Sequence, residues 1–283
     1  GLKPSLVVQD FTIKSLDNQP IIALKQARLR LDMLESLLNF SPVWSNLILN
    51  QVDMSFVQTA DGFWEIPGLP RRAKPEDDGK VQLDSLIDML LLSGRIEFQR
   101  SHLGFTFNSG QQMMLDSPYL LLENADEFHR LSLQIDVDEQ SRSVYLVAEG
   151  KGDPPNQQHF HSKGYLQLNR FPTSAPIAAA SAFLLGGKSA LQGEGQVDAN
   201  IWFETRKDAK GGAGKGYDLV GSLGVQRLSV PFGERHLAMD DFATEMTGFW
   251  MPGGEWRLGL QQINAALKDE HINGLNMAVS SNG

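Results

Sequence analysis

Two Gly-Lys pairs have the residue types of a loop that holds phosphate groups. They lie in Gly187-Lys188-Ser189 and in Gly214-Lys215-Gly216. A P-loop also requires a glycine five residues before the glycine of the pair, and Ser or Thr after the lysine. Ala182 and Ala209 occupy that earlier position, so both segments are expected to be flexible turns.

Two groups of side chains have part of the spacing of a metal site. His159 and His161 share a face if their segment is a strand, but no third ligand is evident nearby. Asp136, Asp138 and Glu139 crowd carboxylates at a predicted strand end, without the glycine that a calcium loop needs. Both groups are expected to lie on solvent-facing polar surfaces, and no metal is predicted.

The remaining catalytic patterns are incomplete. The segment after Gly187 lacks the second glycine of a G-x-S-x-G nucleophile turn. The chain has no cysteine, which excludes a thiolate nucleophile and a disulfide. The two carboxylates of a glycosidase are defined by their distance in space and have no fixed spacing in the sequence. Only 8% of the residues are aromatic, which is few for a surface that stacks against sugar rings. The sequence therefore predicts a protein that is not an enzyme and has no cofactor.

The dominant pattern is the alternation of apolar and polar residues in short stretches separated by turn residues. Leu131, Leu133, Ile135 and Val137 alternate with polar residues, and the same pattern recurs along the chain. Side chains of a strand point to opposite faces with period two, so each stretch has one apolar and one polar face. The repetition predicts a large antiparallel sheet, with few segments available to cover its apolar face.

The predicted elements are mostly strands. The strands are expected over 5–14, 21–32, 43–50, 52–58, 63–66, 95–100, 104–108, 111–115, 118–123, 129–138, 143–150, 159–169, 193–206, 217–230, 236–249, 254–264 and 272–279. A short helix is predicted over 33–40, and a second over 83–92, where leucines follow the spacing of one helix face. The small apolar stretch 172–185 could begin another helix at Pro176.

The predicted domain organisation has three parts. Residues 1–66 form an N-terminal β segment, and the Pro-rich, charged residues 67–80 form an exposed loop or linker. Residues 81–283 continue the β structure, with the helix near 83–92 capping it. The start lacks an initiator Met and reads directly into a strand, so the chain is expected to be a piece of a longer protein.

Bulk charge narrows the classes of partner. The net charge is −9 and the isoelectric point is near 5.2. Nucleic-acid binding depends on cations that neutralise phosphate, so a nucleic-acid partner is disfavoured. A polybasic grip on anionic lipid is disfavoured for the same reason. No apolar run approaches the roughly 20 residues that span a bilayer.

The order of short motifs resembles a known family. The first motif and the strand pair after it contain Leu29, Leu31, Asp32, Ser36, Leu37, Leu38, Asp61, Gly62, Trp64 and Ile66. Further similarity lies in 129–134, 144–150, 164–168 and 193–204. In this order the motifs resemble AsmA-like proteins of the Gram-negative envelope, in particular the YhdP type, over nearly the whole chain.

This resemblance implies a fold and a function. It implies a mainly β protein with a large curled antiparallel sheet, which forms an elongated apolar groove and has a few short capping helices. It implies a periplasmic position, with an inner-membrane anchor outside this sequence. The groove would conduct phospholipid acyl chains between the inner and outer membranes. The implied partners are phospholipids, the rest of the same longer chain and the inner membrane.

The candidate groove residues are apolar positions of the predicted strands. They are Leu29, Leu31, Ile96, Phe98, Leu131, Leu133, Ile135, Leu146, Leu166, Leu168, Ile201 and Phe203. The sequence does not say which apolar positions line the groove and which pack behind it. Two other classes of function stay open: a β scaffold that binds polypeptide during outer-membrane protein assembly, and an all-β carbohydrate-active enzyme or lectin.

Overall fold

The computed structural model describes most of the chain. The described residues are 3–14, 20–38, 40, 43–58, 64–65, 67, 94–108, 110, 112–137, 140–152, 160–172, 194–207, 213–232, 235–251, 255–267 and 270–282. Apart from Pro67, the predicted linker over 67–80 lies outside these residues. So do the helix predicted over 83–92 and, apart from Pro172, the stretch 172–185.

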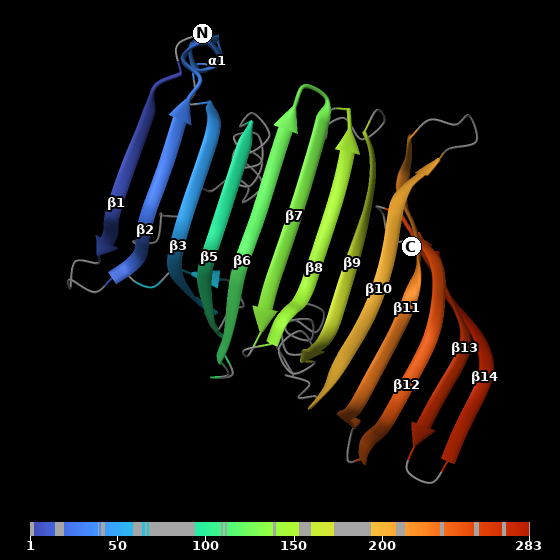
Figure 1. Ribbon diagram of the computed structural model, residues 1–283. Coiled ribbons are helices and arrows are strands. Elements are labelled where there is room, and N and C mark those ends of the chain that lie inside the picture. The colour runs from blue at the N-terminus through green and yellow to red at the C-terminus, as the bar shows by residue number, and fades with distance from the viewer. Residues whose placement is uncertain are drawn as a thin grey trace, which may run out of the picture. The chain divides into compact units, whose positions relative to one another are not determined.

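Two compact units make up the chain, one over Gly1–Leu133 and the other over Gln134–Gly283. The boundary falls inside strand β7 (Phe128–Val137), which therefore contributes residues to both units. The first unit also contains β1 (Ser5–Lys14), β2 (Pro20–Leu31), α1 (Met33–Leu38), β3 (Trp44–Gln58), β4 (Trp64–Glu65), β5 (Arg95–Thr106) and β6 (Gln112–Ala125). Its strand order is β1-β2-β3-β5-β6-β7, and β4 pairs with β3 (Figure 1).

The second unit continues the pattern with longer strands. It contains the end of β7, then β8 (Gln140–Lys151), β9 (His161–Pro172), β10 (Glu194–Lys207), β11 (Ala213–Phe232), β12 (Arg235–Trp250), β13 (Glu255–Leu267) and β14 (Glu270–Asn282). From β8 to β14 each strand pairs antiparallel with the next one in the chain. The prediction of a mainly β protein is confirmed.

One pair of strands differs from the predicted antiparallel arrangement. Strands β3 and β5 are parallel, with Leu47 opposite Ile96 and Phe56 opposite Phe105. Parallel neighbours need a connection that returns to the starting end of the strand, whereas antiparallel neighbours need only a turn. The alternation of residues inside a strand carries no information on that return, which explains the difference.

Three strands are longer than predicted, because the alternation of apolar residues changes phase inside them. Strands β3, β5 and β6 are each continuous where the sequence predicts two separate runs. Gln51 of β3 and Arg100 of β5 have φ angles of 54° and 51°, in the left-handed region. In β3, Leu47 and Leu49 occupy odd positions before Gln51, whereas Val52, Met54 and Phe56 occupy even positions after it. An added left-handed residue lets a strand bend and change phase while the apolar side chains keep to one face.

The same device recurs in several other strands. Among the described residues, the left-handed non-glycine residues inside strands are Asp10, Gln51, Arg100, Arg170, Arg227 and Gln262. In the first unit the pairing of neighbouring strands is interrupted along one transverse row, formed by Asp10, Lys25, Gln51, Arg100 and Pro118. Such interruptions increase local twist and bend the strands.

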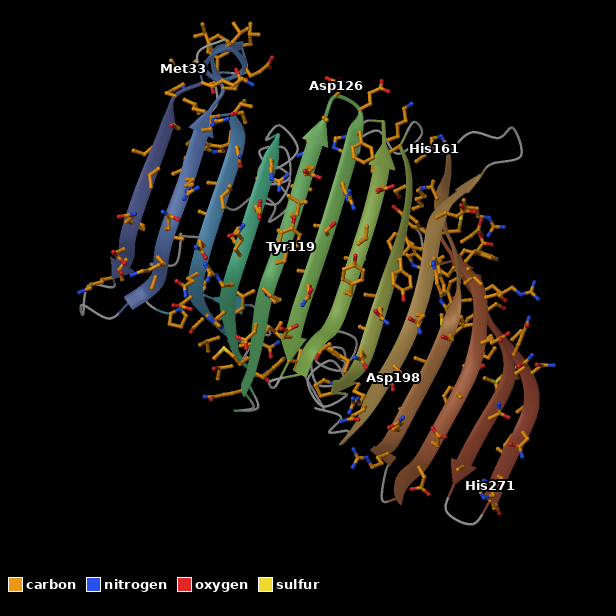
Figure 2. The ribbon with its side chains drawn as sticks, viewed as in Figure 1. Met33, Tyr119, Asp126, His161, Asp198 and His271 are labelled. Carbon is orange, nitrogen blue, oxygen red and sulfur yellow. The ribbon has the colours of Figure 1, made fainter. Side chains whose placement is uncertain are left out.

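Polar side chains compensate for backbone hydrogen bonds lost at these places in the second unit. The Arg170 N–H donates to Asp198 Oδ1 at 2.9 Å, and the Gln262 N–H donates to Asn276 Oδ1 at 3.0 Å. Asp198 lies on β10, beside the strand that bends (Figure 2). These side chains supply acceptors for backbone N–H groups that lie where the strand pairing is interrupted, so the bends do not leave these donors without a partner.

Few apolar side chains of the described residues are fully covered. The buried ones are Ala27, Val43, Val52, Ile96, Phe107, Leu121, Val137, Ala199, Val225 and Ile263. Within the described part of the chain, α1 is the one helix, and it lies beyond the strand ends rather than over a face (Figure 1). Most apolar strand residues are therefore only half-buried, by their neighbours on the same sheet.

Candidate apolar binding face

Strand register in the second unit aligns apolar residues in rows across β8 to β14. One row runs Leu146, Leu166, Ile201, Gly221, Met246, Leu260 and Met277. The next row on the same face runs Ala148, Gly164, Phe203, Leu219, Gly248, Leu258 and Val279. Apart from glycines, every residue in these rows is apolar. We call these two rows the apolar face.

The opposite side of the same strands has one mainly apolar row between two polar rows. The row between the two rows of the apolar face runs Val147, Tyr165, Trp202, Val220, Thr247, Gly259 and Ala278. The rows on either side of it are rich in polar and charged residues, among them Gln167, Asn200, Glu245, Lys163 and Glu204. The second unit thus has faces of different polarity, as the alternation predicts.

The structure brings five of the predicted groove residues together on the second unit. Leu146, Leu166, Ile201 and Phe203 lie on the apolar face, and Leu168 pairs with Val144 and Ala199 one step along the strands. All five are partly accessible. The register therefore supplies a continuous surface where the sequence had supplied only separate apolar positions.

Four other candidates lie on one face of the first unit. Leu29 pairs with Leu47, which pairs with Ile96, and Phe98 lies one step further on the same side of β5. Leu31 lies two residues from Leu29 on β2, so it shares that face. Ile96 is only 2% exposed, which makes it a packing residue rather than a contact surface.

The last three candidates alternate along β7, where Leu131, Leu133 and Ile135 are all half-buried. The polar residue between the first two, Ser132, is buried at 8% exposure. This strand crosses the boundary between the two units, so each unit holds only part of the set.

Aromatic and hydroxyl side chains border the apolar face at one end of the strands. Phe203 contacts Tyr217 edge to face, with ring centroids 6.1 Å apart, and Tyr217 stacks with Trp250 at 6.4 Å. Trp250 in turn pairs with Trp256 across β12 and β13. Tyr and Trp rings suit a boundary that is apolar on one side and wet on the other.

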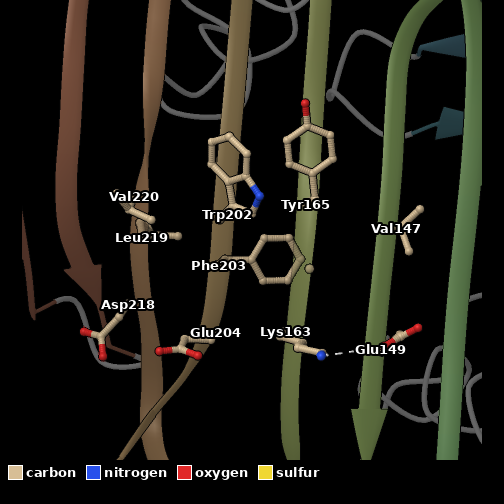
Figure 3. A pocket seen from close by; sticks show the side chains of 11 residues that line it. Val147, Glu149, Lys163, Tyr165, Trp202, Phe203, Glu204, Asp218, Leu219 and Val220 are labelled. Carbon is tan, nitrogen blue, oxygen red and sulfur yellow. Dashed lines mark ion pairs between the residues drawn. The ribbon is translucent and has the colours of Figure 1, made fainter.

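A shallow depression of about 520 Å³ lies on the opposite side, along the mainly apolar row of that side (Figure 3). Tyr165 and Trp202 form its aromatic part with ring centroids 4.9 Å apart, and Trp202 is 51% exposed. The Tyr165 hydroxyl donates to Asn200 Oδ1 at 2.6 Å. Lys163 forms an ion pair with Glu149 at 4.0 Å on the rim. The sequence does not predict this depression, because its residues come from four strands.

A charged network lies on the polar side of the first unit. Arg95 forms ion pairs with Glu97 at 2.9 Å and Glu123 at 2.6 Å, and Gln99 donates to Glu97. Burial raises the pKa of Glu97, but the hydrogen bonds from Gln99 and Arg95 outweigh it, so that this pKa lies below its usual value. The hydrogen bond with Glu97 raises the pKa of Arg95. Glu97 and Arg95 are therefore both charged near neutral pH.

The residues singled out for phosphate or metal chemistry do not assemble into a site in the described part of the chain. Gly214-Lys215-Gly216 lies inside β11, so it is a strand rather than the predicted turn, because β10 and β11 extend further than expected. No group of three His, Asp or Glu side chains among the described residues could hold a metal ion. His161 is described, whereas His159, Asp138, Glu139 and the segment 187–189 lie outside.

These features define a class of protein: a mainly β chain built from open sheet with one apolar face. The sequence identifies the family within this class, because the family model described as YhdP protein matches residues 1–219 of the 283. The chain belongs to the YhdP family of AsmA-like envelope proteins. No curated protein and no solved structure matches it.

In the part of the chain that the structure describes, no helix has the length and apolarity to cross a bilayer.

Proposed function

We propose that this chain binds phospholipid acyl chains along its apolar face and conducts them between the two membranes of the envelope. The observation that carries the proposal is the unbroken register of apolar rows across β8 to β14, whose side chains stay partly accessible. Membership of the YhdP family supports the same function. A partly accessible apolar surface of this extent is costly in water and typical of a binding surface.

The dimensions suit an acyl chain. Strands lie about 4.8 Å apart, so the six intervals from β8 to β14 give each row a length of about 29 Å. The hydrocarbon core of a bilayer is roughly 30 Å thick, and an acyl chain spans one leaflet, which is about half of it. Each row is therefore long enough to hold a whole acyl chain. Each methylene moved from water onto such a surface gains about 0.8 kcal/mol, so a whole acyl chain would bind without any polar contact.

In this proposal the chain acts in the periplasm, anchored to the inner membrane outside the present sequence, and it performs no chemical reaction. Head groups would stay in water while acyl chains slide along the rows. Sliding requires neighbouring positions of similar energy, and each row repeats apolar residues or glycine from one strand to the next.

The test compares two charges placed on neighbouring residues of β10. Ile201→Glu puts a carboxylate on the apolar face, whereas Trp202→Glu puts one on the opposite side at a position already 51% exposed. Mass spectrometry of organic extracts should find phospholipid with the unchanged chain and with Trp202→Glu. Ile201→Glu should retain several-fold less. A lipid-free unchanged chain, after gentle purification and lipid challenge, would contradict the proposal.

One observation favours the alternative of a polypeptide-binding scaffold. Among the described strands β14 pairs only with β13, and its Ile272, Leu275, Met277 and Val279 are 40% to 50% exposed. A free, apolar strand edge can accept another polypeptide strand. A peptide that binds the chain and is displaced by Met277→Pro, in a protein free of lipid, would favour the scaffold.

A further inference from the structure

The short helix α1 turns its apolar residues toward solvent, whereas an ordinary surface helix turns them toward the protein core. Its apolar residues Met33, Leu34, Leu37 and Leu38 are 48%, 57%, 70% and 65% exposed. At about 100° per residue they occupy one arc of roughly 140° on the helix surface. Phe40, just after the helix, is 95% exposed. Five large apolar side chains of α1 and the residues just after it are therefore exposed.

Polar contacts hold the helix in this orientation. The Ser36 hydroxyl donates to the Asp32 carbonyl oxygen at 2.5 Å and accepts from the Val43 N–H at 2.9 Å. Asp32 also accepts from the Glu35 N–H at 3.3 Å and forms an ion pair with Lys3 at 3.0 Å. The polar side of the helix is thus fixed to the ends of β2 and β3, and the apolar arc is turned outward.

The position of α1 makes the arc available to a large flat partner. The helix lies beyond the ends of β1 to β3, and Met33 marks this end of the first unit (Figures 1 and 2). Arg28 and Arg30 lie two residues apart on the polar side of β2, leading toward the helix, and both are exposed. Neither guanidinium forms an ion pair with a described residue.

We propose that α1 and Phe40 seat this end of the first unit on a phospholipid bilayer, with Arg28 and Arg30 facing lipid phosphates. Exposed apolar residues next to arginines are the composition of an interfacial membrane contact. Because the net charge is −9, two neighbouring cations without an ion pair to a described residue are a distinct feature beside this arc. A lipid carrier needs such a contact where lipid enters, although the docking itself does not depend on lipid transport.

A bilayer accounts for the surface better than a second copy of the chain does. Stable protein interfaces bury about 1,200–2,000 Å² in total, more than two six-residue helices provide. Two copies meeting at this end would also bring like-charged arginines together, which disfavours association. Lipid phosphates, in contrast, complement the arginines.

The experiment is flotation of the 283-residue chain with vesicles of phosphatidylcholine, with and without phosphatidylglycerol. Leu37→Glu with Leu38→Glu removes two of the most exposed residues of the arc. Trp202→Glu with Val220→Glu adds the same charge at sites 51% and 52% exposed, far from α1 in the sequence. Arg28→Gln with Arg30→Gln tests the phosphate contact.

The proposal predicts that the α1 variant binds vesicles at least about tenfold more weakly than the unchanged chain, since each leucine contributes about 1.5–3 kcal/mol. The control variant should bind normally, and the arginine variant should lose only the preference for phosphatidylglycerol. Lipid extracted from the α1 variant should be unchanged, which separates this test from the proposed function. The proposal would be overturned if the α1 variant floated as well as the unchanged chain. It would also be overturned if the unchanged chain were a dimer that does not bind vesicles and the α1 variant were a monomer.

Discussion

At the scale of single residues, Gly164 shows how closely the strands approach on the apolar face. A Cβ atom at this position would collide with the Phe203 ring and lie 2.7 Å from the Val147 carbonyl oxygen. Because the carbonyl belongs to the backbone, it cannot move aside cheaply. The aromatic ring covers the glycine, a pairing that stabilises sheets with small residues.

We therefore expect Gly164→Ala to destabilise the chain by about 1–3 kcal/mol, the usual cost of overpacking. Gly104→Ala is the matched control, because its nearest neighbour would be Ser55 Oγ at 3.4 Å, an ordinary contact. That change should be neutral or slightly stabilising, since alanine restricts the unfolded chain. Urea unfolding measures both, and equal midpoints would contradict the close approach.

The second residue-scale prediction concerns pH. The folded pKa of Glu97 lies below the model-compound value of 4.5, so the carboxylate stabilises the fold fully above pH 4.5. This contribution is lost as the pH falls through the lower, folded-state pKa. Glu97→Gln should lower the free energy of unfolding by about 1–3 kcal/mol at neutral pH, because it removes hydrogen bonds to a charged group. In acid, where the carboxylate is protonated, the same change should have little effect.

The free energy of unfolding of both proteins, measured between neutral and acid pH, checks this expectation. The two curves should converge on the acid side, and Glu204→Gln, at an exposed carboxylate of the second unit, serves as the control. A constant difference at all pH values would show that Glu97 acts by packing alone.

At the scale of elements, the left-handed residues decide how long the strands are. Each follows an Asn or Gln and an apolar residue, as in Leu49-Asn50-Gln51 and Leu168-Asn169-Arg170. This recurring signal is visible in the sequence, but the change of phase that it causes looks like the end of a strand. The strands themselves were predicted because alternation is local, whereas a change of phase does not distinguish a left-handed residue inside one strand from a turn between two strands.

For this reason Gln51→Gly should stabilise the chain by up to about 1 kcal/mol, since glycine adopts positive φ without steric cost. Gln51→Val should destabilise it by about 1–2 kcal/mol, because a β-branched residue is disfavoured there. Asp53→Gly, at an exposed position of the same strand, should only lose stability. Chemical denaturation ranks the three, and a loss of stability with Gln51→Gly would refute the left-handed assignment.

At the scale of the whole molecule, the sequence predicted apolar strand positions but not the rows that they form. Leu166 and Ile201 are 35 residues apart and become neighbours only through the register of β9 and β10. The parallel pairing of β3 with β5 and the outward apolar arc of α1 were also not predicted. Each depends on how distant segments meet, which alternation within one strand does not encode.

The central claim is that acyl chains contact one side of the second unit and not the other. The most direct measurement places a photoreactive amino acid at Ile201 or at Trp202, in the chain produced in cells, and identifies the adducts by mass spectrometry. We predict covalent phospholipid adducts at Ile201 and none above background at Trp202. Equal labelling at both positions, or polypeptide adducts alone at Ile201, would contradict the assignment of this face to lipid.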